Sequence, residues 1–218
     1  MSVERIDVAG DPPVRGVLHL AGSTKGDGLV LTHGAGGNAR APLLVALGEA
    51  FAARGLTVLR YDLPFRQASR KAPPRPSGAG RDREGLRTMM TAMRSRVGGR
   101  VFLGGQSYGG RQASMLAAAE AGLVDGLLLL SYPLHPPGRP AELRTSHLPK
   151  LAAPTMFAHG SRDPFGSLEE IEAARTLIPS RTVLVAVPGA GHDLFRAPRR
   201  AGTDVAAEIV AAFLDLVG

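Results

Sequence analysis

The sequence predicts an α/β fold built on a mostly parallel, twisted sheet of about seven or eight strands with helices on both faces. Short apolar runs alternate with helical segments along all 218 residues. The pentapeptide Gly105–Gly109 joins one apolar run directly to a helical segment, and an acid and a histidine follow two later runs. A chain of this length builds one well-buried core, so residues 1–218 are expected to form a single domain without a large lid domain.

The first part of the chain is expected to supply one edge of the sheet and two buried strands. Residues 4–9 and 14–21 alternate in polarity around a Gly-Asp-Pro-Pro turn signal, which predicts an antiparallel pair at the edge. Apolar runs over 28–32 and 56–61 predict buried strands. Between them, residues 42–55 have a helical pattern that ends at a glycine.

The next segment is predicted to be a loop followed by a helix. Residues 66–80 are rich in Pro, Gly and Arg and have no period, so a long surface loop is expected. A helix is expected over 82–97, where Met89, Met90 and Met93 recur at helical spacing. That pattern favours packing in the core over a soft metal site.

The second half of the chain continues the alternation of strands and helices. Strands are expected over 101–103, 126–130, 155–158 and 182–187, and helices over 112–119, 167–177 and 203–216. Ser167 and Glu170 form a capping box at the start of one of these helices. Residues 131–153 form a proline-interrupted linker too short for a lid domain, so it is expected to be one wall of a lightly covered cleft. Within it, His135 and His147 lack a third ligand at metal spacing, which favours packing or pocket polarity over zinc.

Gly-Gln-Ser-Tyr-Gly at 105–109 is the most informative motif. A strand that turns into a helix at a Gly-x-Ser-x-Gly places the serine at the tip of a tight bend, with its hydroxyl above the sheet. Gly105 and Gly109 are required where strand and helix nearly touch. Ser107 is therefore a candidate nucleophile, although the pentapeptide alone would also fit a plain turn.

An acid and a histidine follow Ser107 in loops after strands. Asp163 follows the run 155–158, and His192 follows the run 182–187. The chain order serine, acid, histidine is that of α/β-hydrolases and differs from the orders in chymotrypsin and subtilisin. Asp193 is a second candidate for the acid, but its place next to the histidine makes orientation toward the ring awkward.

Backbone donors for an oxyanion are predicted at two places. The N–H of Tyr108, at the start of a helix, would face an oxyanion on a substrate carbonyl. His-Gly-Ala-Gly-Gly at 33–37 follows a strand, and small residues there let backbone N–H groups approach a substrate oxygen. Ala35 is assigned as this second donor, with Gly36 as the alternative. A glycine-rich phosphate cradle is the competing interpretation, but no Gly-x-x-x-x-Gly-Lys-Ser/Thr is present.

These motifs together resemble the α/β-hydrolase superfamily across nearly all of the chain. The resemblance implies a serine hydrolase in which Ser107 attacks, His192 moves the proton and Asp163 orients the imidazole. Three further stretches, 131–138, 143–145 and 147–149, resemble a small lidless branch. That branch includes the hydrolase-like domain of a chromatin acetyltransferase complex subunit, a testis-expressed protein and many uncharacterised bacterial proteins. The chain is also similar in size to dienelactone hydrolases but has serine where they carry cysteine.

Composition narrows the partners and the compartment. The chain has no cysteine, which excludes disulfides, thiolate metal sites and a cysteine nucleophile. No motif indicates a cofactor or metal, and no signal core or membrane-spanning run is visible, so a cytoplasmic protein is expected. The net charge is +7, and residues 64–100 hold ten Lys or Arg against two acids. No aromatic residues are interleaved for base stacking, so nucleic-acid binding is not expected, although the basic loop over 66–83 could favour an anionic group on the substrate.

Two functions of different classes follow from these residues. The first is hydrolysis of short carboxylic esters or thioesters, acetyl to butyryl, through Ser107, His192 and Asp163 with Ala35 and Tyr108 as the oxyanion hole. The second is a non-catalytic scaffold that keeps the fold and acts through partner binding. An intact set of three separated residues favours the first. A haloperoxidase-like side activity at the same residues needs nothing more than the three, and neither the substrate's identity nor the oligomeric state follows from the sequence.

Overall fold

The computed structural model describes residues 2–21, 26–196 and 201–218. Its centre is an eight-stranded sheet in the order β1-β2-β4-β3-β5-β6-β7-β8. The pairs β1–β2 and β2–β4 are antiparallel and the other pairs are parallel. The strands are β1 (Ser2–Val8), β2 (Val14–Leu20), β3 (Gly28–Thr32), β4 (Thr57–Tyr61), β5 (Val101–Gln106), β6 (Leu127–Leu130), β7 (Thr155–Gly160) and β8 (Thr182–Val187). The predicted fold class is confirmed, with the antiparallel pair at the expected edge.

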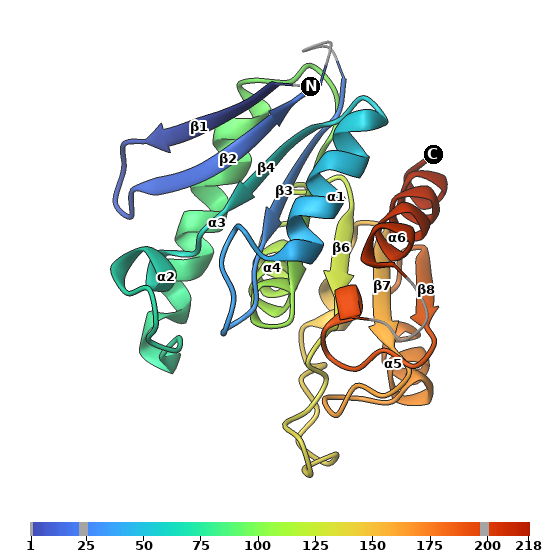
Figure 1. Cartoon of the computed structure of the whole chain (residues 1–218). Coiled ribbons are helices and arrows are strands. Elements are labelled where there is room, and N and C mark those ends of the chain that lie inside the picture. Colours follow the sequence, from blue (N-terminus) through green and yellow to red (C-terminus); the bar gives the residue numbers. More distant parts are fainter. Residues whose placement is uncertain (1, 22–25, 197–200) are drawn as a thin grey trace.

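Helices cover both faces of this sheet (Figure 1). On one face, α1 (Pro42–Ala53) and α6 (Gly202–Val217) pack together over the apolar side chains of the central strands. On the other face lie α3 (Ala79–Arg94), α4 (Tyr108–Ala119) and α5 (Leu168–Arg175). The buried central strands are mostly apolar on both sides because helices cover both faces, although β4 also buries Arg60. The parallel strands end together at one edge, where the loops that carry the candidate residues meet.

The basic segment after β4 differs from the expected surface loop. It forms a short helix α2 (Pro64–Ala68) and a 3₁₀ turn η1 (Pro76–Gly78), and α3 begins at Ala79 rather than at 82. Proline at the first position starts both short elements, since its fixed φ suits a helix start. A tertiary contact also stabilises this segment: the buried Asp82 carboxylate accepts a hydrogen bond from the Phe65 N–H at 3.0 Å, which joins α2 to α3. Sequence period alone could not reveal that contact.

Other expectations agree with the structure to within a few residues. Met89, Met90 and Met93 are fully buried in the core. The Ser167–Glu170 capping box forms, and α5 ends at Arg175, two residues earlier than expected. No helix forms between 131 and 147, and a 3₁₀ turn η2 (Leu148–Lys150) follows. Tyr132 and Leu148 of the linker are fully buried, residues 137–143 are exposed, and no helical lid lies on this described segment. The expectation that the linker forms one wall of the cleft is not met, because none of its residues lines the cavity at Ser107 described below.

Candidate active site

Ser107 lies at a strained bend between β5 and α4. Its φ of 49° and ψ of −116° belong to a region that side-chain-bearing residues rarely adopt. A Cβ on Gly105 would stand 2.5 Å from the Gly110 nitrogen, and one on Gly109 would collide with the His33 carbonyl oxygen. Glycine is therefore required at both positions. The Ser107 N–H donates to the Leu130 carbonyl at 2.8 Å, which ties the bend to the neighbouring strand.

Three of the predicted residues meet in one hydrogen-bonded chain. The Ser107 hydroxyl lies 2.8 Å from His192 Nε2, and His192 Nδ1 lies 2.8 Å from an Asp163 carboxylate oxygen. The Asp163 side chain is fully buried, whereas that of His192 is 28% exposed. An Nδ1–H that donates to the carboxylate leaves Nε2 free to accept the serine proton. These contacts are the ones a serine–histidine–acid set requires.

The acid loop is held by groups that the sequence analysis did not single out. The second Asp163 oxygen accepts the Phe165 N–H at 2.9 Å. His159 is fully buried, lies 3.6 Å from Asp163 and donates from Nε2 to the Gly166 carbonyl at 2.9 Å. Burial lowers the pKa of His159, so this imidazole stays neutral beside the carboxylate. The sequence feature that could have indicated this role is the position of His159, four residues before Asp163.

Neighbouring side chains settle which carboxylate contacts His192. The Phe165 ring packs against the His192 imidazole with centroids 4.3 Å apart. Asp193 instead accepts the Phe195 N–H at 3.1 Å and lies 3.4 Å from the Arg196 guanidinium. Asp193 therefore belongs to the start of the 3₁₀ turn η3 (Leu194–Arg196). The acid in contact with His192 is Asp163, the first candidate.

The loop after β3 forms a wall of the cavity at Ser107. This cavity has a volume of about 420 Å³ and is lined by Ala35, Gly36, Ser107 and His192 together with the polar residues Gln106 and Asp193 and several apolar residues. A Cβ on Gly34 would lie 3.2 Å from the Ser107 Cβ, so the loop approaches the bend closely. Gly37 N–H closes a turn by donating to the Gly34 carbonyl at 3.0 Å. Both candidate donors, Ala35 and Gly36, thus lie at the cavity.

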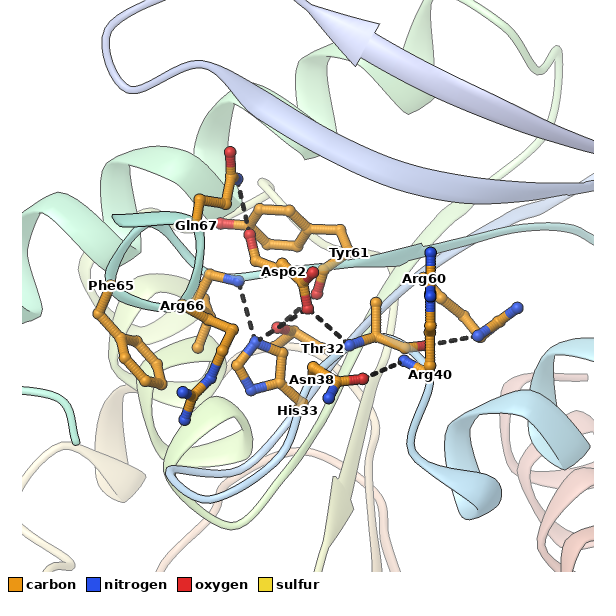
Figure 2. A network of polar contacts seen from close by, with 12 residues as sticks. Thr32, His33, Asn38, Arg40, Arg60, Tyr61, Asp62, Phe65, Arg66 and Gln67 are labelled. Atoms are coloured by element: carbon orange, nitrogen blue, oxygen red, sulfur yellow. Dashed lines mark hydrogen bonds and ion pairs between the residues drawn. The ribbon is translucent and has the colours of Figure 1, made fainter. Parts of the chain in front are cut away.

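A buried histidine anchors this loop (Figure 2). His33 donates from Nδ1 to the Gly34 carbonyl at 2.8 Å and accepts the Leu63 N–H at Nε2, at 3.1 Å. Burial lowers the pKa of His33, which keeps the ring neutral and able to fill both roles. The imidazole therefore joins the cavity loop to the corner after β4.

Tyr108 contributes a side chain as well as the predicted N–H. Its hydroxyl donates to Asp82 at 2.7 Å, and its ring packs edge-on against Phe65. Burial raises the pKa of Asp82, although hydrogen bonds from Tyr108 and Phe65 oppose that shift. This contact ties α3 to the first turn of α4. Tyr108 N–H, the predicted donor, lies at the N-terminus of that helix.

The remaining candidates of the sequence analysis take other roles. His147 Nε2 lies 2.8 Å from the Ser114 hydroxyl, and His135 Nε2 lies 3.3 Å from Glu170. Across the described ranges, no group of three His, Cys, Asp or Glu side chains is placed to hold a metal ion. In the same ranges, no helix has the length and apolarity needed to cross a membrane.

Comparison with known proteins places the geometry in a family. Residues 25–217 match the model of the alpha/beta hydrolase domain family. A dienelactone hydrolase from Anabaena variabilis superimposes with a TM-score of 0.78 at 23% identity, covering 99% of this chain and 98% of that one. An alpha-beta serine hydrolase homologue from Coxiella burnetii gives 0.76 at 19% identity, covering 97% and 98%. A serine hydrolase without lid from Xanthomonas campestris gives 0.75 at 17% identity, covering 99% and 95%.

Proposed function

The chain belongs to the alpha/beta hydrolase domain family, and on that premise we propose that it is a serine hydrolase of short carboxylic esters or thioesters. The observation that carries the proposal is the hydrogen-bonded chain from Ser107 through His192 to Asp163. A serine hydroxyl is a weak nucleophile unless an adjacent base accepts its proton. Here the base lies at hydrogen-bond distance, and a buried carboxylate sets its tautomer.

The first half-reaction forms an acyl-enzyme. Ser107 Oγ attacks the carbonyl carbon while His192 Nε2 takes the hydroxyl proton, and the carbonyl oxygen becomes an oxyanion. We assign the N–H groups of Ala35 and Tyr108 as its donors. The tetrahedral intermediate then breaks its bond to the alcohol or thiol, which leaves with the proton held by His192.

The second half-reaction releases the acid. Water attacks the acyl carbon, His192 accepts a proton from the water, and the bond to Ser107 Oγ breaks as that oxygen regains a proton from His192. Asp163 stays ionised and stabilises the imidazolium formed in each step. Loss of one oxyanion donor would raise the barrier by about 3 kcal/mol, so the loop after β3 contributes to catalysis, although less than Ser107 or His192, whose loss costs several kcal/mol more.

The surroundings of the cavity favour short acyl groups. None of residues 131–153 lines the cavity at Ser107: residues 131–135 and Leu148 are buried in the core, whereas residues 137–143 are exposed. This segment therefore gives that cavity no apolar cover. A long acyl chain gains affinity at about 0.8 kcal/mol per methylene only where the methylenes leave water. We therefore propose acetyl to butyryl esters as the preferred substrates.

Covalent labelling tests the proposal. A fluorophosphonate should label the native protein at Ser107, and peptide mapping should find the adduct on the peptide that contains it. Ser107→Ala should abolish labelling without changing the circular dichroism spectrum. Labelling should also be slow in His192→Ala, because the base is missing. A native protein that stays unlabelled would favour the scaffold function instead.

A further inference from the structure

A second cavity of about 680 Å³ adjoins the candidate site. It shares the lining residues Gly37, Ala41 and Pro42 with the cavity at Ser107, so the two cavities are neighbours along the loop after β3. Its lining differs in charge, since it includes Arg40, Arg66 and Arg70 and one acid, Asp62. A group bound there would lie beside a substrate whose carbonyl faces Ser107.

Arg66 is the unusual member of this set. Arg66 is only 7% exposed. In the described structure its guanidinium donates only to carbonyl oxygens, which belong to Ala35 at 2.6 Å, Ser69 at 3.2 Å and Arg70 at 2.5 Å. Its Nε is buried without a partner in the described structure. The guanidinium carbon lies 5.0 Å from the Phe65 ring centroid, which compensates only part of the charge. Buried charges are normally paired with an opposite charge, and among residues 2–21, 26–196 and 201–218 no acid forms an ion pair with Arg66.

The two exposed arginines beside it are also without acidic partners. Within the described ranges, neither Arg40 nor Arg70 takes part in an ion pair, whereas Arg87, Arg100 and Arg175 elsewhere each have at least one. The one acid that lines the cavity, Asp62, accepts the Ala39 N–H at 2.6 Å (Figure 2). The nearby His33 ring is neutral and accepts at Nε2, so it forms no ion pair with this carboxylate, which offsets one of the three guanidinium charges.

The backbone reinforces this positive field. The N-terminus of α1 adjoins both cavities through Ala41 and Pro42, and no side chain caps it. A helix N-terminus without a cap carries a partial positive charge. The cavity therefore combines three guanidinium groups, one engaged carboxylate and a helix start next to the reacting serine.

We propose that this cavity, which we call the arginine pocket, binds an anionic group of the substrate. This inference rests on the proposed function and narrows it to esters or thioesters that carry a carboxylate or phosphate on one side of the scissile bond. Arginine suits both groups because its planar fork donates two parallel hydrogen bonds. The bond from Arg66 to the Ala35 carbonyl links the arginine pocket to the proposed oxyanion loop.

Binding to the inactive protein provides a test that does not depend on turnover. Glutarate and glycerol 3-phosphate are titrated into Ser107→Ala protein by calorimetry, with glutaramide and glycerol as their neutral counterparts. At least one anion should bind detectably more tightly than its counterpart, and its affinity should fall as salt is added. The comparison of the two anions tells whether carboxylate or phosphate is preferred.

Charge-removing variants locate the bound anion. Arg40→Gln and Arg70→Gln should each weaken the preferred anion roughly tenfold, the loss expected for one charge-assisted hydrogen bond. Arg54→Gln is the matched control, since Arg54 is an exposed arginine at the opposite end of α1. The same anion should inhibit turnover of a butyryl ester by the native enzyme competitively.

Each result bears on one proposal or the other. Equal binding of anions and neutral counterparts, or unchanged affinity in Arg40→Gln and Arg70→Gln, would overturn the arginine pocket while fluorophosphonate labelling still supports the hydrolase. Anion binding that does not compete with ester turnover would also overturn it as a substrate subsite. Failure of labelling, with anion binding intact, would instead reject the proposed hydrolase.

Discussion

The backbone N–H of Leu63 donates a 3.1 Å hydrogen bond to Nε2 of the buried His33 imidazole. The other ring nitrogen donates to the Gly34 carbonyl at 2.8 Å. One side chain thus fixes the distance between the corner after β4 and the loop that carries Ala35. The proposed oxyanion hole depends on that distance, because its donors must be in place before charge develops.

Replacing His33 with leucine should lower activity more than a comparable core change does. The Leu63 N–H loses its acceptor, which costs about 1–3 kcal/mol of stability, and the loop loses its anchor. We expect kcat for a butyryl ester to fall roughly 10- to 100-fold. The upper value is about the loss in kcat expected when one oxyanion donor is removed. His147→Leu is the control, because it breaks a buried contact with Ser114 away from the cavity. Its kcat should stay within a few-fold of wild type, and equal kcat losses in the two variants would refute the anchoring role.

Two neighbouring acid positions should differ sharply in their effect on catalysis. Asp163→Asn removes the carboxylate that contacts His192, and we expect kcat to fall about 10²- to 10⁴-fold. Asp193→Asn removes the charge that faces Arg196 but keeps a side-chain oxygen that can accept the Phe195 N–H, so kcat should change less than threefold. Steady-state kinetics on the purified variants decides the matter. A larger loss in Asp193→Asn would show that the acid is assigned wrongly.

Backbone strain at Ser107 should be measurable in variants that have lost activity. With φ at 49°, a Cβ is unfavourable here, so Ser107→Gly should be more stable than Ser107→Ala by about 1 kcal/mol. The order of stability should reverse at Ser114, a buried position inside α4, where glycine costs about 1 kcal/mol relative to alanine. Urea unfolding of the four variants measures both differences. The same order at both positions would argue against strain at the bend.

Turnover should decrease as the acyl chain lengthens. In a series of p-nitrophenyl esters from acetyl to palmitoyl, we expect kcat/KM to be highest from acetyl to butyryl, because longer chains stay in contact with water. No jump in rate should occur when the substrate forms a lipid interface. Faster turnover of the palmitoyl than of the butyryl ester would mean that another segment covers the site.

Stability should fall on mild acidification because the folded chain holds two histidines neutral, the buried His19 and the partly buried His147. Burial, aided by nearby arginines, lowers the pKa of His19 and of His147 to about 4. The unfolded chain takes up protons near pH 6.5 and the folded chain only near pH 4, so the stability present above pH 6.5 is lost as the pH falls toward 4. The Tm should therefore drop between pH 7 and pH 4.5, and His19→Gln should reduce that drop. A Tm that is flat over this range would contradict the argument.

The strand and helix pattern was readable from the sequence because each element carries its own period. Apolar runs such as 28–32 and 101–103 are buried on both sides, so their hydrophobicity alone marks them as central strands of a parallel sheet. The order of Ser107, Asp163 and His192, each in a loop after a strand, predicted that they would meet at one edge of that sheet. Local chemistry, in glycines, turn signals and a capping box, carried these predictions.

The tertiary structure alone decided which distant groups support those residues. The sequence favoured Asp163 over Asp193 because Asp193 is adjacent to the histidine, but the contacts that hold each carboxylate depend on where the chain bends after β7 and β8. The helices within 64–94 depend on the Phe65 N–H and the Asp82 carboxylate meeting in space. Three buried polar side chains show this: His33 contacts Leu63, His159 contacts Gly166, and Arg66 contacts Ala35. In the first and third pairs the two residues lie about thirty positions apart in the sequence. A residue's own type and neighbours determine its local conformation, but the partners of a buried polar group are set by the packing of the whole chain.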